Sequence, residues 1–237
     1  MNTGQRFKEK LRNGQSVAVI NADYPSSGLV EFLGRPELGV DAVMLDAEQG
    51  NVDIETIEEM ARAARLNRLC VLVRLFSPEP WVIERIMLRG IDGIVVPRLD
   101  NAEAAQKVVD AVRYSFPDEM ASKVIVVQIE SREAHEDLDA MLRVADIDAY
   151  FIGPVDLARS MGKKGDYHAP AVVEAVDDIL RRINAAGHAA GTLVKPGDAE
   201  QWRERGARFL YFHVNDWLRI GARSFPFDQA ASSAPRA

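Results

Sequence analysis

Short apolar segments alternate with amphipathic segments along most of the chain. The apolar segments are four to six residues long and rich in β-branched residues, so each one predicts a β-strand. They lie at residues 17–20, 42–45, 70–73, 93–96, 124–129, 149–152, 189–194 and 209–212. Between them, apolar residues recur with helical spacing at residues 54–66, 81–88, 102–112, 134–144, 171–186 and 199–205. The pattern predicts a chain in which strands and helices alternate.

The predicted strands lack the polar alternation of a half-exposed sheet, which indicates a parallel sheet buried on both faces. Eight strand–helix units favour a single (β/α)8 TIM barrel with its active site at the C-terminal ends of the strands. A doubly wound open sheet is the competing fold, but no glycine-rich phosphate turn follows the first strand. The length of 237 residues suits one such barrel. We expect a barrel domain over residues 1–227 and a loose tail over residues 228–237.

Charge and cysteine content disfavour several classes of partner. The formal net charge is −7 and the basic residues form no run, so neither nucleic acid nor an anionic membrane is expected as a partner. The one cysteine, Cys70, allows no intrachain disulfide. No segment approaches the roughly 18 apolar residues of a membrane span, and residues 1–14 do not resemble a secretory signal. We expect a soluble, cytoplasmic protein that acts on a small molecule.

Polar residues follow several of the predicted strands, where a barrel would carry its chemistry. In chain order they are Asp46, Glu48, Gln49, Arg74, Glu130, Gly153, Pro154, Asp156, Lys195, His213 and Asn215. Glu130 and Asp156 offer hard oxygen ligands on neighbouring strands, which favours Mg²⁺ or Mn²⁺ over the alternative of two solvated loop acids. The Arg74 guanidinium suits a substrate carboxylate, with an ion pair to Asp46 or Glu48 as the alternative.

Several of these segments together resemble the HpcH/HpaI aldolase family of metal-dependent class II pyruvate aldolases. The most specific are VQIESREA at residues 127–134 and FIGPVDL at residues 151–157. Supporting segments lie at residues 43–48, 73–74, 95–97 and 101–104, and the resemblance runs from about residue 7 to about residue 222.

The resemblance implies a metal centre at the mouth of the barrel. Glu130 and Asp156 would bind the divalent metal, Mg²⁺ or Mn²⁺, with Co²⁺ as a third candidate. Asp46 and Glu48 would hold waters on that metal. The metal would lower the cost of removing a methyl proton from the ketoacid and would stabilise the enolate that attacks an aldehyde.

The same resemblance implies a set of residues that bind the 2-ketoacid substrate. They are Arg74, Gln128, Gly153, Pro154 and Asp156, with backbone amides near Gly153 and Asp156 taking the carboxylate. Together these residues predict a carbon–carbon lyase of the aldolase type. An oxaloacetate-type decarboxylase, a citrate-synthase-like condensing enzyme and a non-catalytic metal-binding homologue are the alternatives.

The chain departs from the family pattern at the catalytic acid–base group. The family usually has a histidine where this chain has Gln49, and its aspartate partner corresponds to Leu88. An amide cannot shuttle protons near neutral pH, so either another base acts or the reaction needs none. His213 is the histidine at a predicted strand end and is the candidate replacement, with a hydrogen-bonded barrel histidine as the alternative. Lys195 would suit a Schiff-base aldolase, but the two paired acids argue against that class.

By resemblance, the protein should form a homo-oligomer, a trimer or a hexamer. A short apolar helix is predicted at residues 216–222, near the end of the chain. Trp217, Phe225 and Phe227 could anchor an interface there. The alternative is that these aromatic side chains close the protein's own barrel.

Overall fold

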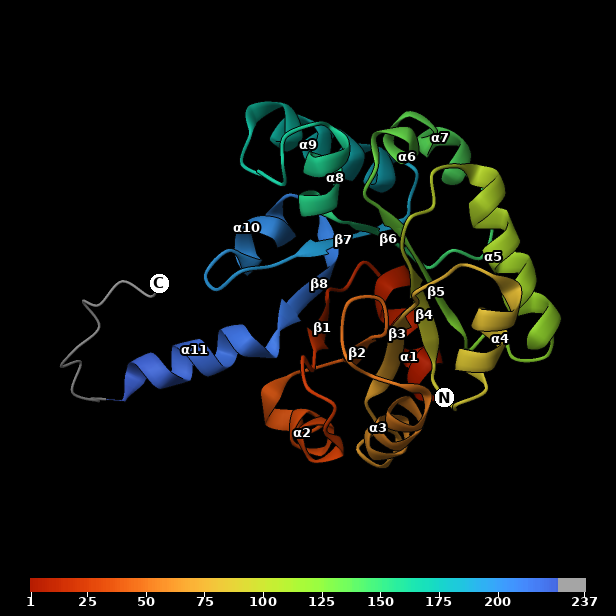
Figure 1. Cartoon of the computed structure of the whole chain (residues 1–237), viewed down its shortest axis with the longest axis vertical. Coiled ribbons are helices and arrows are strands. Elements are labelled where there is room, and N and C mark those ends of the chain that lie inside the picture. The colour runs from red at the N-terminus through yellow and green to blue at the C-terminus, as the bar shows by residue number, and fades with distance from the viewer. Residues whose placement is uncertain (226–237) are drawn as a thin grey trace.

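The computed structural model describes residues 1–225, and its strands close into one parallel barrel in sequential order (Figure 1). The strands are β1 (Val17–Asn21), β2 (Ala42–Asp46), β3 (Cys70–Arg74), β4 (Gly93–Val96), β5 (Val124–Ile129), β6 (Ala149–Ile152), β7 (Ala189–Leu193) and β8 (Ala207–His213). β8 pairs with β1 and closes the barrel. The predicted TIM barrel is confirmed. The predicted tail at residues 228–237 and Phe227 lie outside the described residues.

Helices surround the barrel and connect successive strands (Figure 1). They are α1 (Thr3–Arg12), α2 (Ser27–Leu33), the 3₁₀ helix η1 (Pro36–Leu38), α3 (Ile54–Leu66), α4 (Pro80–Met87), α5 (Ala102–Ser115), α6 (Arg132–Glu136), α7 (Leu138–Met141), α8 (Pro154–Ser160), α9 (Pro170–Ala185), α10 (Ala199–Glu204) and α11 (Val214–Ser224). The single helix predicted at residues 134–144 is instead two short helices, α6 and α7. The break falls at Asp137, whose carboxylate accepts the N–H of Ala102 at the start of α5 over 2.7 Å.

Alternate side chains of the strands build two separate cores. One set points outward and packs against the helices, and the other fills the barrel interior. The interior set includes Val17, Val19, Ala42, Met44, Leu72, Val95, Val126, Phe151, Phe209 and Tyr211. Because both faces of each strand are buried, the strands read as continuous apolar runs in the sequence.

Helix α1 closes the amino-terminal end of the barrel. Its Phe7 and Leu11 belong to the interior core, and the Phe7 ring meets Phe209 edge-on at 6.0 Å between centroids. Polar groups of α1 also bind three aspartates, Asp41, Asp92 and Asp148, that precede even-numbered strands. The carboxylate of each of these aspartates accepts a backbone N–H from the strand that precedes it in the chain. With this end closed, the cavity for chemistry lies at the carboxyl ends of the strands.

Among the described residues, no helix combines the length and apolar character needed to cross a membrane.

Candidate active site

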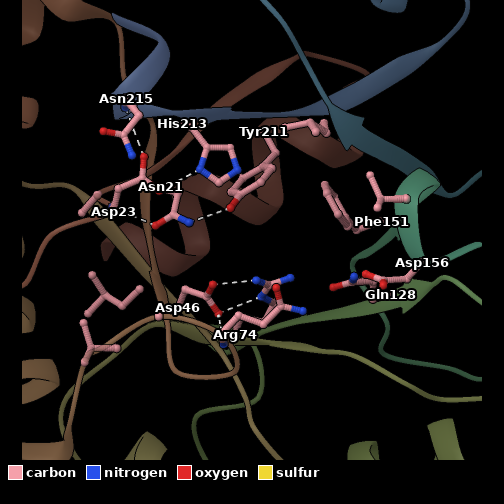
Figure 2. Close-up of a pocket in the computed structure, with 18 of the residues that line it drawn as sticks. Asn21, Asp23, Asp46, Arg74, Gln128, Phe151, Asp156, Tyr211, His213 and Asn215 are labelled. Atoms are coloured by element: carbon pink, nitrogen blue, oxygen red, sulfur yellow. Dashed lines mark hydrogen bonds and ion pairs between the residues drawn. The ribbon is translucent and has the colours of Figure 1, made fainter. Parts of the chain in front are cut away.

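The carboxyl ends of the strands surround a cavity of about 460 Å³. Most of the predicted site residues line it, and they come from different strands and loops: Asp46, Gln49, Arg74, Gln128, Gly153, Pro154, Asp156, His213 and Asn215. Figure 2 shows that the labelled side chains face a common open space. Glu48 and Glu130 contact members of this wall. Lys195 lines a different cavity and lies 3.3 Å from Asp216, so the structure does not bring it to this site.

Arg74 and Asp46 form a bidentate ion pair in the wall of the cavity. They are direct neighbours in the register of β2 and β3. Arg74 Nε lies 2.9 Å from Asp46 Oδ1, and Nη2 lies 2.6 Å from Oδ2. Burial is the largest influence on the pKa of Asp46 and opposes its ionisation. The hydrogen bonds and positive charge of Arg74, together with the N–H groups of Glu48 and Gln49, outweigh burial and hold the pKa of the carboxyl below its ordinary value. The ion pair that the sequence left as an alternative is therefore present, and it fixes the guanidinium at the cavity.

Glu48 extends this charged network from Arg74 to Arg98. Its carboxylate lies 3.3 Å from Arg74 Nη1 and 2.9 Å from the Nε of Arg98. Arg98 has a left-handed backbone, with φ of 58°. This turn aims its backbone N–H at Glu130 Oε1 over 2.8 Å. Arg98 thus connects the acids that follow β2 and β5.

Glu130 is a buried acid, with 7% of its surface exposed. Its Oε2 accepts a hydrogen bond from the side-chain amide of Gln128. Burial raises the pKa of Glu130 to about 7; the Arg98 N–H opposes this shift, and nearby Asp156 and Glu48 add to it. Gly153 makes the packing feasible, because a Cβ there would lie 2.9 Å from Gln128 Nε2 and 3.0 Å from Glu130 Oε2.

The donor atoms on this side of the cavity fit a hard divalent cation. Asp156 lies in the first turn of α8, and its Oδ1 is paired with Arg159 over 2.6 Å. The buried Oε1 of Gln128 has no hydrogen-bond partner. Within residues 1–225 no cluster of three or more His, Cys, Asp or Glu side chains could hold a metal, so the protein would supply two carboxylates. Mg²⁺ and Mn²⁺ commonly use one or two carboxylates and take their other ligands from water and substrate.

A histidine–aspartate pair lies on another part of the cavity wall. His213 Nδ1 lies 2.7 Å from Asp23 Oδ1, and the second oxygen of Asp23 accepts the backbone N–H of Asn215 over 3.1 Å. The Asn21 side chain accepts the N–H of Asp23 over 3.0 Å and donates to the Tyr211 hydroxyl over 2.8 Å. Figure 2 shows these groups together near the ends of β1 and β8.

Sequence reasoning missed three members of this wall, Asn21, Asp23 and Tyr211, as well as Arg98. Asn21 ends β1 and Asp23 follows it, so the strand-end argument applied to the first strand would have found both. In the sequence, Tyr211 lies within the apolar run at residues 209–212, which gave no sign that its hydroxyl faces the cavity. Arg98 follows β4, and no pattern around it marked its backbone as an acid-binding group.

Solved structures and characterised relatives share this fold and length. A protein of the HpcH/HpaI aldolase/citrate lyase family from Burkholderia cenocepacia matches with a TM-score of 0.83 and 23% identity, covering 92% of this chain and 96% of that chain. A hydroxypyruvate/pyruvate aldolase from Roseovarius nubinhibens is 31% identical and covers 86% of this chain and 88% of its own length. A 2-keto-3-deoxy-L-rhamnonate aldolase from Salmonella gallinarum is 29% identical, and the match covers 97% of this chain and 96% of that protein.

The family model described as HpcH/HpaI aldolase/citrate lyase matches residues 35–216. This range includes Arg74, Glu130, Asp156 and His213, and it begins after Asp23. The relatives named above are aldolases, which confirms the predicted aldolase-type enzyme class and does not favour the decarboxylase, condensing or non-catalytic alternatives. The chain belongs to the HpcH/HpaI aldolase/citrate lyase family.

Proposed function

We propose that the protein is a divalent-metal-dependent aldolase that makes or breaks a bond at the methyl carbon of a pyruvate-like 2-ketoacid. The observation that carries this proposal is the buried carboxylate of Glu130, which lies behind Gln128 in the wall of the cavity that Asp156 and the fixed guanidinium of Arg74 line. A cluster of like charges at one barrel mouth is costly unless a cation joins it.

The metal we propose is Mg²⁺ or Mn²⁺, with Co²⁺ as a third candidate, held by Glu130 and Asp156. When bound, it would supply positive charge to the keto oxygen as the neighbouring carbon becomes nucleophilic. Asp156 would exchange its present partner Arg159 for the metal. The unpartnered Oε1 of Gln128 is a further polar atom at this point of the cavity.

The ketoacid would be oriented by this chain's own residues. Arg74 is already held by Asp46 in a planar fork, so its guanidinium would lose little side-chain freedom when a substrate arrives. The turn at Gly153 and Pro154 begins α8. Pro154 has no N–H and the Gly153 N–H donates to the Ile129 carbonyl over 3.0 Å, so the amides of Val155 and Asp156 would bind the carboxylate. Because the Roseovarius relative is named a hydroxypyruvate/pyruvate aldolase, we propose one of these ketoacids as the donor.

The proposal is tested by deuterium exchange into the methyl group of pyruvate, followed by NMR with and without Mn²⁺. We expect exchange to require the metal and to be lost in Glu130→Gln. Direct Mn²⁺ binding, measured by calorimetry, should weaken at least about tenfold in Gly153→Ala, because the added methyl group displaces Gln128 and Glu130.

A matched glycine substitution controls the binding measurement. Gly28 lies in α2, where an added Cβ would come no closer than 3.9 Å to another atom, so Gly28→Ala should bind Mn²⁺ as the wild type does. Exchange without metal, or unchanged exchange in Glu130→Gln, would contradict the proposed reaction.

We also propose that the protein works as a homo-oligomer, a trimer or a hexamer. Helix α11 extends away from the barrel (Figure 1) and exposes Leu218 and Ile220. Trp217 packs against the protein's own core, so this residue helps to close its own barrel, which was the alternative to an interface role. A cytoplasmic location remains a prediction.

A further inference from the structure

We propose that His213, held by Asp23, is the acid–base residue of this aldolase. This inference rests on the proposed function and deepens it, because it names the group that moves the proton. The pair faces the same cavity as Arg74 and Asp156. In Figure 2 it lies across the open space from Asp156 and Gln128, the side assigned above to the metal and the ketoacid.

The contact with Asp23 fixes which ring nitrogen of His213 is available. A carboxylate can only accept, so the proton of neutral His213 lies on Nδ1, which donates to Asp23 Oδ1 over 2.7 Å. Nε2 then keeps its lone pair and makes no hydrogen bond to another described residue. The His213 side chain is 32% exposed and the Asp23 side chain 12%, so the imidazole reaches the cavity while its partner is shielded.

The surroundings of Asp23 hold it in place for this contact. Its backbone is left-handed, with φ of 57°, and its N–H is bound by Asn21 over 3.0 Å. Asn21 and His213 are direct neighbours in the register of β1 and β8. With the Asn215 N–H on its second oxygen, Asp23 has both carboxylate oxygens occupied. Such restraint on the loop after a strand is typical of positions where the backbone serves a site.

The other titratable groups near His213 are less suited to proton transfer. Tyr211 meets the His213 ring edge-on at 5.1 Å, and burial raises the pKa of its hydroxyl well above the ordinary value. Tyr24 donates to Asn215 over 2.6 Å. Asp46 is held ionised by Arg74. Gln49, at the family's catalytic position, carries an amide that does not titrate.

The proton balance of the reaction closes with this one group. In cleavage, Nε2 takes the proton of the hydroxyl on C4 and the bond between C3 and C4 breaks. The aldehyde leaves, and the bonding electron pair stays with the ketoacid as its enolate. The imidazolium, stabilised by Asp23, then returns the same proton to C3 and yields the methyl group of pyruvate. Condensation is the reverse.

Replacing His213 by asparagine tests this role. We expect the kcat of pyruvate addition to glycolaldehyde, and the methyl exchange of pyruvate, to fall by about 100-fold or more. Mn²⁺-dependent decarboxylation of oxaloacetate needs no base to form the enolate, so it should change less than about twofold, as should the KM for pyruvate. Asp23→Asn should lower kcat by at least about tenfold and move the acidic limb of the pH–rate profile to lower pH, because the imidazolium loses its partner.

A second histidine–aspartate pair outside the cavity serves as the control. His135 Nε2 lies 2.8 Å from Asp178, and His135→Asn should leave both reactions unchanged. Nitrogen-15 NMR of the imidazoles should show that neutral His213 carries its proton on Nδ1 in the wild type, and that Asp23→Asn removes this tautomer preference without changing the spectrum of His135. This measurement does not depend on turnover.

The outcomes separate this proposal from the function on which it rests. Aldol addition within about threefold of wild type in His213→Asn would overturn the role of His213, as would an equal loss of oxaloacetate decarboxylation, which indicates a structural effect. Absence of metal-dependent methyl exchange in the wild type would overturn the aldolase proposal and this role with it.

Discussion

Glu130 combines burial with a charge that its neighbours do not neutralise. Its carboxylate receives one backbone N–H and one side-chain amide, while Asp156 and Glu48 are both close enough to repel it. These contacts hold the acid in position without removing the cost of ionising it. A cation at this point would remove that cost, so metal binding and proton release should be linked here.

The stability of the metal-free protein should therefore fall as the pH rises. The pKa of Glu130 is about 7 in the folded state against an ordinary value of 4.5, so the folded state holds the extra proton between these limits. The contribution of this proton to the free energy of unfolding is fully present below pH 4.5. It is lost as the pH rises through about 7, and the loss is at most about 3 kcal/mol. Urea unfolding of the EDTA-treated protein at pH 5 and pH 8 measures it.

The matched variant for this prediction is Glu130→Gln, which keeps the shape and removes the titration. The variant should gain stability relative to wild type on going from pH 5 to pH 8, and saturating Mn²⁺ should stabilise only the wild type. An identical pH dependence of the two proteins would show that Glu130 titrates normally.

At the residue scale, sequence reasoning found the individual strand-end side chains more readily than their partners. Glu130, Asp156, Arg74 and His213 each follow an apolar run, and a rule about strand ends is enough to select them. The pairing of Asp23 with His213 required knowledge that β8 returns to β1, a contact that joins the two ends of the barrel. Pairings across such a closure depend on three-dimensional register, which a local pattern does not contain.

Among the elements, α1 contributes a buried ion pair to the closed end of the barrel. Lys8 Nζ lies 3.1 Å from Asp148, and the two side chains are only 4% and 6% exposed. Lys8 also donates to the carbonyl of Lys123 over 2.6 Å. Burial raises the pKa of Asp148 even with Lys8 beside it, so the carboxylate depends on this cation.

Removing the Lys8 amine should destabilise the fold strongly. Lys8→Ala leaves Asp148 buried with only the exposed guanidinium of Arg12, 4.0 Å away, as a cation, which costs about 3–5 kcal/mol. Lys10→Ala is the matched control on the same helix, because the pair of Lys10 with Asp41 is 39% exposed on the lysine side and should contribute at most about 1 kcal/mol. Chemical denaturation of both variants checks the difference, and equal losses would argue against the buried pair.

The strands were predictable as elements, while several helices were not. All of the apolar runs became strands, because burial on both faces leaves a continuous apolar signal. Helix α1 has only two large apolar residues in its buried face, Phe7 and Leu11, which is too few for a clear helical period. The short helices α2 and α8 span two turns each, so their pattern is equally brief.

At the scale of the whole molecule, α11 projects from its own barrel (Figure 1). Val214 is its buried residue, while Leu218 and Ile220 are 56% and 49% exposed. Apolar side chains on a projecting helix are typical of a surface that a second copy covers.

Charged substitutions on α11 should therefore dissociate the oligomer. Leu218→Glu combined with Ile220→Glu should lower the molar mass measured by light scattering to that of one chain, while the barrel still unfolds cooperatively. Leu66→Glu, at an 81% exposed leucine on α3, should leave the mass unchanged. A wild type that already runs as a monomer would contradict this assignment of α11.

The closure of the barrel by α1 also bears on biosynthesis. Helix α1 is synthesised before the strands that it covers, yet Phe7 packs against Phe209 on β8 and Lys8 binds Asp148 on the loop before β6. The helix has no complete docking site until β8 has been made, so its apolar face cannot be fully buried during most of translation. Although α1 is made before the barrel strands, it is thus among the last elements to pack, and Phe7 and Leu11 stay available in the interval to chaperones that bind nascent chains.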